Sequence, residues 1–211
     1  YEGEFTDATS EVFRGIDNVC TVPNYSNGDR HQRCFAGIDT GLSNDYSVLT
    51  IMNEAGRVLF MDRLKGENIN TIANKFANNL ARFNISGGYI ETNGIGRAMF
   101  DLISPKQRKL KGFTTTQDSK TQIVRTLIED IEAVNVELPS KELESECYKE
   151  LSLYTYKLNT NGKLSFTHPA GIHDDIVDSL MLANKARNEI KTNKIYIGRS
   201  AQTYKPNFGV S

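Results

Sequence analysis

The apolar residues change their spacing along this chain, and that change limits the folds open to it. Three consecutive segments, one ending at Asp39 and the others at 47–52 and 57–64, have the composition and the turn residues of a meander of strands. From Ile69 onward, apolar residues recur on one helical face, and helices then alternate with short strands up to a last helix over 174–189. Such alternation indicates an α/β fold, with a mixed sheet and helices on both of its faces.

Gly, Pro and capping residues bound the later apolar runs and indicate where each helix or strand begins and ends. Ser119 and Gln122 have the spacing of a capping box, which predicts a helix start. A right-handed crossover would make the strand ending at Glu91 parallel to its neighbour. The expected elements are a helix over 69–83, a strand ending at Glu91, a helix over 97–102, a strand over 111–115, a helix beginning at Ser119, a strand over 134–138, a helix from Ser140, and a hairpin of 151–158 with 164–167.

Three acidic motifs stand where apolar segments stop or start, at 35–41, 88–94 and 173–180. If the first two strands are neighbours, Asp39 and Glu91 lie at one edge of the sheet, where open α/β sheets place their sites. Three carboxylates together make a hard-oxygen site suited to Mg²⁺ or Mn²⁺, and a pair of such ions can cut phosphodiesters. Each motif alone has a second explanation, because such carboxylates are also common in turns and at helix starts.

Net charge does not indicate a nucleic-acid partner, because the 211-residue chain carries a formal charge of −1 at pH 7. Basic residues nevertheless outnumber acidic ones between positions 97 and 125. That stretch is suited to holding a phosphate backbone beside a metal site, and it is equally typical of a solvated surface. No apolar run approaches the ~20 residues that span a bilayer, so no membrane partner is expected. The basic residues are Arg97, Lys106, Arg108, Lys109, Lys111, Lys120 and Arg125, and the acidic ones are Asp101 and Asp118.

Four motifs occur in an order typical of one family, at 36–48, 89–96, 119–125 and 169–180. The most specific is the last, Pro-Ala-Gly-Ile-His-Asp-Asp-Ile-Val-Asp-Ser-Leu. Over residues 35–187 the set resembles the nuclease domain of the large terminase subunit of tailed phages, in the ribonuclease H-like or resolvase-like superfamily. The resemblance implies the ribonuclease H-like fold, a mixed central sheet with helices on both faces.

The resemblance also divides the chain into three parts. Residues 34–190 would form the nuclease domain, 1–33 a linker or arm following an absent ATPase domain, and 191–211 a C-terminal tail. The sequence contains no Walker A pattern, which is a glycine, four residues and then Gly-Lys-Ser/Thr. This agrees with an isolated nuclease half.

The resemblance implies a metal-dependent endonuclease that cuts without sequence specificity and uses Mg²⁺ or Mn²⁺, expected as two ions. Asp39 would bridge the metals, Glu91 would complete the first site, and an acid of the last helix would hold a metal from the other side. Asp174 and Asp175 are adjacent on a helix and cannot point the same way. We expect Asp175 to be the metal ligand, because the family's paired acids usually present the second one. The choice of this ligand among Asp174, Asp175 and Asp178 stays open. Asp45 and Asp174 are candidates for additional ligands, and His173 and Asp178 for groups that orient the ligands.

The implied substrate is double-stranded DNA in concatemers. Lys120 and Arg125 are candidates for gripping a phosphate near the cut, and Arg97, Lys109 and Lys111 for guiding the duplex, with a solvated surface as the alternative. The implied partners are the terminase ATPase domain, the portal and the small terminase subunit, in the host cell cytoplasm during virus assembly. Whether packaging ends at a headful or at a defined site stays open.

Other functions fit parts of this pattern. A Holliday-junction resolvase or a ribonuclease H shares the fold and the metals. Residues 37–41 also resemble the phosphate loop of actin-like sugar kinases, but the second glycine-rich loop and the adenosine-binding segment of that class are missing from the sequence. A non-catalytic docking module of the packaging motor is a further alternative, and it would not need Asp39, Glu91 and Asp175 together.

Overall fold

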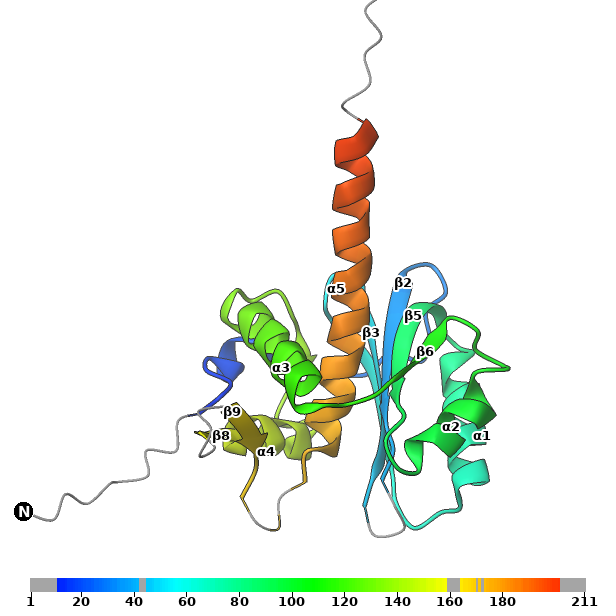
Figure 1. Ribbon diagram of the computed structural model, residues 1–211, viewed down its shortest axis with the longest axis horizontal. Coiled ribbons are helices and arrows are strands. Elements are labelled where there is room, and N and C mark those ends of the chain that lie inside the picture. Colours follow the sequence, from blue (N-terminus) through cyan, green and yellow to red (C-terminus); the bar gives the residue numbers. More distant parts are fainter. Residues whose placement is uncertain (1–10, 42–44, 159–163, 170, 172, 202–211) are drawn as a thin grey trace, which may run out of the picture.

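The centre of the molecule is a mixed sheet, as the sequence predicts. Its strands are β2 (Arg33–Asp39), β3 (Ser47–Asn53), β4 (Val58–Leu64), β5 (Asn84–Glu91) and β6 (Leu110–Phe113). They lie in the order β4-β3-β2-β5-β6, with an antiparallel meander of β2, β3 and β4 and with β5 and β6 parallel to β2 (Figure 1). The structure, a computed structural model, describes residues 11–41, 45–158, 164–169, 171 and 173–201.

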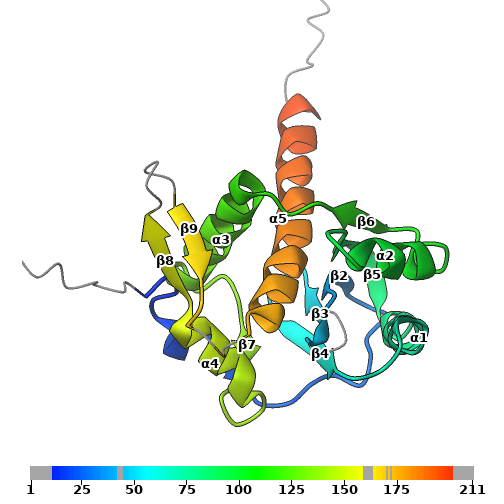
Figure 2. The ribbon, with the colours of Figure 1, turned by 60° about the horizontal axis from the view of Figure 1, so that its bottom comes forward.

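Helices cover both faces of the sheet, which confirms the α/β class. They are α1 (Ile69–Leu80), α2 (Gly96–Ile103), α3 (Gln117–Glu132), α4 (Ser145–Leu153) and α5 (Asp175–Ala201). α1 and α2 pack together on one face, and α5 lies across the other face in contact with β2, β3 and β5 (Figures 1 and 2). α3 and α4 pack against α5. Within the described ranges, no helix combines the length and the apolar character that crossing a bilayer requires.

Side chains alternate along β2, so this strand contributes to two hydrophobic cores. Ala36 and Ile38 belong to the core beneath α1 and α2. Gly37 faces α5, because a Cβ added to it would lie 1.9 Å from the carbonyl oxygen of Ser179. Asp39 is two residues further along and therefore lies on the α5 side of the sheet as well. Helix α5 thus packs directly on the backbone of β2 beside the first acidic motif.

The segment before the central sheet packs on the domain and does not extend away from it. It contains a 3₁₀ turn, η1 (Ile16–Asn18), and a short strand, β1 (Cys20–Val22). β1 pairs in parallel with β7 (Leu138–Pro139) in a small separate sheet. Phe13 is buried in the core beneath α5. Residues 1–10 of the expected arm lie outside the described residues.

The expected strand over 134–138 is wrong in extent. Val134 has a φ of 53°, in the left-handed region, and its side chain is 58% exposed. The backbone N–H groups of Val134 and Asn135 bond to carbonyls in the last turn of α3, so these residues end the helix. Glu137 forms an isolated parallel bridge with Arg57, and β7 pairs with β1 in a small separate sheet.

The start of α3 also differs from its prediction. The capping box joins Thr116 and Ser119, and not Ser119 and Gln122. The Thr116 hydroxyl accepts from the Ser119 N–H at 3.2 Å, and the Ser119 hydroxyl accepts from the Thr116 N–H at 2.8 Å. Serine replaces the usual Glu or Gln at the third helical position, so the usual sequence pattern of a capping box predicts a helix start that is about one turn too late.

Two further boundaries differ from the prediction. The late hairpin consists of β8 (Thr155–Leu158) and β9 (Leu164–Thr167), because 151–153 belongs to α4. Cys147 and Leu151 of α4 are buried one turn apart, and burial of this helical face extends the helix. α5 continues to Ala201, beyond the expected end near position 189, since 189–197 contains neither glycine nor proline.

A candidate active site between two strand ends and a helix start

Asp39 and Glu91 lie side by side at the carboxyl ends of β2 and β5. The parallel register pairs Ile38 with Ile90, which makes the two acids neighbours across the strands. Asp39 is buried, with 7% of its surface exposed. Burial raises the pKa of Asp39 well above its usual value, and a hydrogen bond with the Glu91 carboxyl raises it further. A cation bound beside Asp39 would offset the cost of ionising this buried carboxyl group.

The first turn of α5 brings further carboxylates to this pair. The charges of Asp178 and Asp175 add to the rise in the pKa of Asp39. Burial raises the pKa of Asp178 to about 7, although the Lys120 ammonium opposes this shift. Burial also raises the pKa of Asp175. The structure thus brings together acids from three separate elements, which the sequence placed far apart.

Lys120, in the first turn of α3, neutralises part of this negative charge. Its ammonium group binds both carboxylate oxygens of Asp178 and lies 3.8 Å from Asp174 Oδ2. Burial lowers the pKa of Lys120, but the Asp178 and Asp174 charges outweigh burial and raise it overall. We had expected Lys120 to grip a phosphate, and in this structure its partners are the acids of α5.

The paired acids before and at the start of α5 point to different neighbours. Asp174 Oδ1 lies 3.4 Å from His168 Nε2, on the same side as Lys120. Asp175 Oδ2 lies 3.6 Å from His173 Nδ1, which is also 3.8 Å from Asp45 Oδ1. Asp175 and Asp45 therefore share a histidine, and Asp174 is directed elsewhere.

Glu150 of α4 is a component that the sequence reasoning missed. Its side chain is 1% exposed, and its Oε2 atom accepts hydrogen bonds from the backbone N–H groups of Ile176 at 2.9 Å and Val177 at 3.2 Å. This carboxylate thereby satisfies free N–H groups at the start of α5. A sequence signal did exist, since Glu150 lies three residues after Cys147 on an otherwise buried helical face.

Arg63 of β4 links Glu150 to the histidine side of the site. Its guanidinium lies 3.5 Å from Glu150 Oε1 and 3.5 Å from the centre of the Tyr46 ring. The Tyr46 ring in turn makes an edge contact with His173, with centroids 5.4 Å apart. Packed side chains therefore connect the cap of α5 to His173 and Asp175.

The donor set fits a hard divalent cation. All of the clustered donors are carboxylate oxygens, the ligand type that Mg²⁺ and Mn²⁺ prefer. Asp175 Oδ2 is buried and has no hydrogen-bond partner among the described residues, so it is available to a cation. In the part of the chain that the structure describes, no three His, Cys, Asp or Glu side chains already converge on one point as ligands. Instead, Asp178 is paired with Lys120, and Asp39 and Glu91 adjoin each other at the ends of β2 and β5.

The remaining basic candidates are all exposed. Arg125 is exposed on α3, and Arg97 pairs with Asp101 of its own helix at 3.2 Å. Lys109 and Lys111 are exposed at the start of β6. Because Phe113 pairs with Glu91, Lys109 lies about four residues, or ~13 Å, from Glu91 along the sheet. Their role in DNA binding stays a prediction.

Solved structures with the same arrangement of elements identify the fold. The large terminase nuclease from thermophilic phage G20c with bound magnesium is 21% identical to this chain, with a TM-score of 0.72 over 84% of this chain and 97% of that chain. The chain has the fold of a large terminase nuclease domain. No protein-family model and no curated protein sequence matches it.

Further structures share this terminase nuclease fold. The nuclease domain of the Thermus phage P74-26 large terminase is 20% identical, with a TM-score of 0.68 over 82% of this chain and 94% of that one. A longer large terminase from another thermophilic bacteriophage is 9% identical, with a TM-score of 0.66, and this chain covers 45% of it. The G20c nuclease has also been crystallised with cobalt and with zinc.

Proposed function

We propose that this chain is the nuclease domain of a phage large terminase, a metal-dependent endonuclease that cuts concatemeric double-stranded DNA. The observation that carries the proposal is the placement of Asp39 and Glu91 at the ends of neighbouring strands, with α5, which begins at Asp175, packed on β2 beside them. The terminase nuclease fold supports it, and the metal-bound forms of the G20c nuclease support the choice of chemistry.

Asp39, Glu91 and Asp175 would hold Mg²⁺ or Mn²⁺, expected as two ions, with Asp45 and Asp174 as candidates for additional ligands. When bound, such ions activate water and stabilise the leaving oxygen of a phosphodiester. Burial raises the pKa of Asp39, so its carboxyl group would have to release its proton to act as a ligand. Lys120 pairs with Asp178 and limits the repulsion between the acids.

The proposed partners follow from the same assignment. They are double-stranded DNA, the terminase ATPase domain, the portal and the small terminase subunit, in the host cell cytoplasm during virus assembly. The match to less than half of a longer large terminase agrees with a domain that works beside others.

The test is nicking and linearisation of supercoiled plasmid with Mn²⁺, Mg²⁺ or EDTA. We expect metal-dependent cutting that is lost in Asp39→Asn, a substitution that keeps the shape of the side chain. Asp101→Asn is the matched control, because Asp101 is an exposed acid of α2. Cutting by folded Asp39→Asn at the control rate would overturn the assignment of the site.

The same assay separates the alternatives that share this fold. A Holliday-junction resolvase would prefer a four-way junction, and a ribonuclease H would prefer an RNA–DNA hybrid, so each is compared with linear duplex at equal concentration. A protein that binds duplex but cuts none of these substrates with either metal would instead be the docking module.

A further inference from the structure

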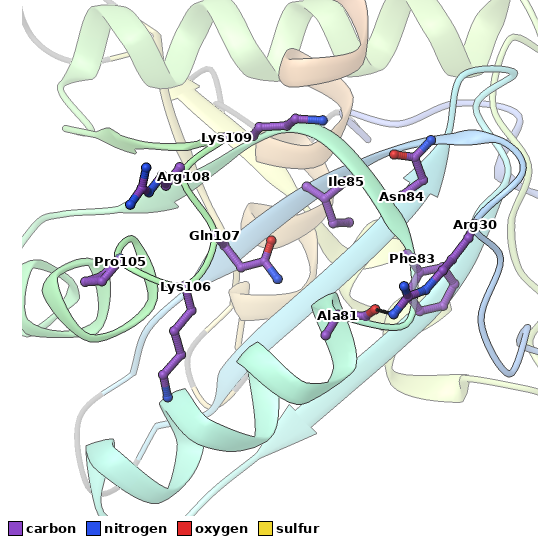
Figure 3. Close-up of a pocket in the computed structure, with 10 residues that line it drawn as sticks. All are labelled: Arg30, Ala81, Phe83, Asn84, Ile85, Pro105, Lys106, Gln107, Arg108 and Lys109. Carbon is purple, nitrogen blue, oxygen red and sulfur yellow. Dashed lines mark hydrogen bonds between the residues drawn. The ribbon is translucent and has the colours of Figure 1, made fainter.

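A cleft of about 600 Å³ opens at the end of the sheet opposite to the carboxylates (Figure 3). Its walls come from the end of α1, the start of β5 and the turn that leads into β6. Asn84 and Ile85 line it, and these residues begin the strand that ends at Glu91. The cleft is therefore separate from the site described above.

The cleft is strongly basic. Arg30, Lys106, Arg108 and Lys109 line it and are exposed, and its lining includes neither Asp nor Glu. Lys106 donates to the Asn74 side chain at 2.9 Å, and Arg30 donates to the Ala81 carbonyl, so both cations keep their charge without a carboxylate partner. Within the described ranges, Arg108 and Lys109 form no ion pair. Uncompensated cations in a concave surface attract an anion.

The positive charge continues around the edge of the sheet. A second hollow of about 270 Å³ is lined by Arg108, Lys109 and Lys111 together with Tyr89 and, from α5, Ala186 and one acid, Glu189. Lys111 is the strand partner of Tyr89, whose hydroxyl donates to Glu189 of α5 at 2.6 Å, so Lys111 lies on the α5 side of the sheet. Cations thus run from the cleft to the face of the sheet that carries Asp39.

The chemistry of the lining fits a phosphate backbone better than an acidic peptide. Stable protein interfaces bury aromatic or aliphatic anchors in their centre. Here Phe83 and Ile85 are already buried in the domain core, and the exposed lining is cationic. Arginine and lysine side chains are the usual donors to phosphate oxygens.

The spacing also suits one duplex that reaches both places. Along the sheet, Lys109 lies ~13 Å and Asn84 ~23 Å from Glu91 at the usual rise per residue. These lengths correspond to roughly 4 and 7 base pairs of B-DNA at 3.4 Å per step.

We propose that the cleft lined by Arg30, Lys106, Arg108 and Lys109 binds the phosphodiester backbone of double-stranded DNA about 4–7 base pairs from the phosphate that the carboxylates cut. This inference rests on the proposed nuclease function. The cleft holds the duplex in register but takes no part in the chemistry.

The test compares two variants with equal loss of charge. One is the triple variant Lys106→Gln, Arg108→Gln and Lys109→Gln. The control is Lys75→Gln, Lys141→Gln and Lys149→Gln, which removes three exposed lysines of α1 and the α4 region outside the cleft. Binding of a 30-base-pair duplex is measured by fluorescence anisotropy in EDTA at several KCl concentrations, and plasmid cutting is measured with Mn²⁺.

We expect the cleft variant to bind the duplex roughly 10- to 100-fold more weakly near 0.1 M salt. The slope of log K against log salt concentration should decrease in magnitude by about 2–3, because each lost phosphate contact removes about 0.9. The control should change affinity by less than about threefold, because it loses only diffuse attraction. With saturating plasmid, the maximum cutting rate of the cleft variant should stay within about twofold of the starting protein, with the loss in KM.

Equal affinity and equal salt slope in the two variants would overturn the cleft proposal. In that case, plasmid cutting by the unsubstituted protein would still support the nuclease function. The proposal would also be overturned if the unsubstituted protein showed no measurable binding to the duplex at any salt concentration. Absence of cutting with intact binding to the cleft would contradict the nuclease function alone.

Discussion

Gly37 in β2 lies in direct contact with the backbone of Ser179 in α5. A Cβ on Gly37 would lie 1.9 Å from the Ser179 carbonyl oxygen and 2.5 Å from the Ala183 nitrogen. Thr50 of β3 fixes the same contact, since its hydroxyl lies 2.7 Å from the Ser179 hydroxyl. Asp175 is one helical turn before Ser179, so this close approach brings it to Asp39.

Replacement of Gly37 by alanine should therefore disrupt both the fold and the site. We expect a loss of at least about 3 kcal/mol in the free energy of unfolding, because the helix has to move away from the sheet. The measurement is urea unfolding, together with plasmid cutting with Mn²⁺.

Gly66→Ala is the matched control for this prediction. Gly66 has a φ of 75° and no atom within 4 Å of an added Cβ, so only backbone strain of about 1 kcal/mol is expected. Equal losses in the two variants would mean that the contact with Ser179 is not tight.

Removal of the Glu150 carboxylate should loosen the start of α5. Glu150→Ala leaves the N–H groups of Ile176 and Val177 and the Arg63 guanidinium without their buried partner. We expect a loss of about 3 kcal/mol in unfolding free energy and weaker Mn²⁺ binding by calorimetry. Glu146→Ala, on the same helix with a side chain 43% exposed, should cost less than about 0.5 kcal/mol. Unchanged Mn²⁺ affinity in Glu150→Ala would mean that the cap does not position Asp175.

The metal-free protein should become less stable as pH rises from 5 to 8.5. Burial raises the pKa of Asp178 from 3.8 to about 7 and that of Glu150 from 4.5 to about 8. A pKa raised by folding contributes stability that is complete below the unfolded value and is lost as pH rises through the folded value. The two shifts together predict a fall of roughly 6 kcal/mol at about 1.4 kcal/mol per pKa unit, measured by urea unfolding in EDTA.

A substitution isolates the Asp178 contribution to this pH dependence. Asp178→Asn removes the titrating group, so its unfolding free energy should fall less steeply over the same range. Stability that rises from pH 5 to 8.5 in the unsubstituted protein would contradict the electrostatic account of the site.

Divalent metal should reverse this loss. Mn²⁺ binds only the folded site, so it should raise the melting temperature, and more at pH 8 than at pH 5.5 because the ligands have to release their protons. Asp39→Asn should abolish the rise, whereas Asp101→Asn should retain it. An equal rise in both variants would place the metal elsewhere.

Much of the architecture was predictable because it depends on local pattern. The strands that end at Asp39 and Glu91, and the helix that begins at Asp175, appear as predicted because apolar spacing and breakers act over a few residues. The predictions failed where distant segments compete for the chain. The strand expected over 134–138 is reduced to β7, which pairs with the distant β1, and the extent of α4 depends on burial of its inner face.

The sequence by itself determined that Asp39 and Glu91 end two apolar strands and that a right-handed crossover would make the second strand parallel to its neighbour. That this neighbour is β2 was decided by the tertiary structure. Only the tertiary structure decided which way the other charged groups face. Lys120 binds Asp178 across 58 residues of sequence, and Glu150 binds Ile176 across 26. No local pattern encodes such pairs, because they form only when packing excludes water and leaves each buried charge in need of a partner.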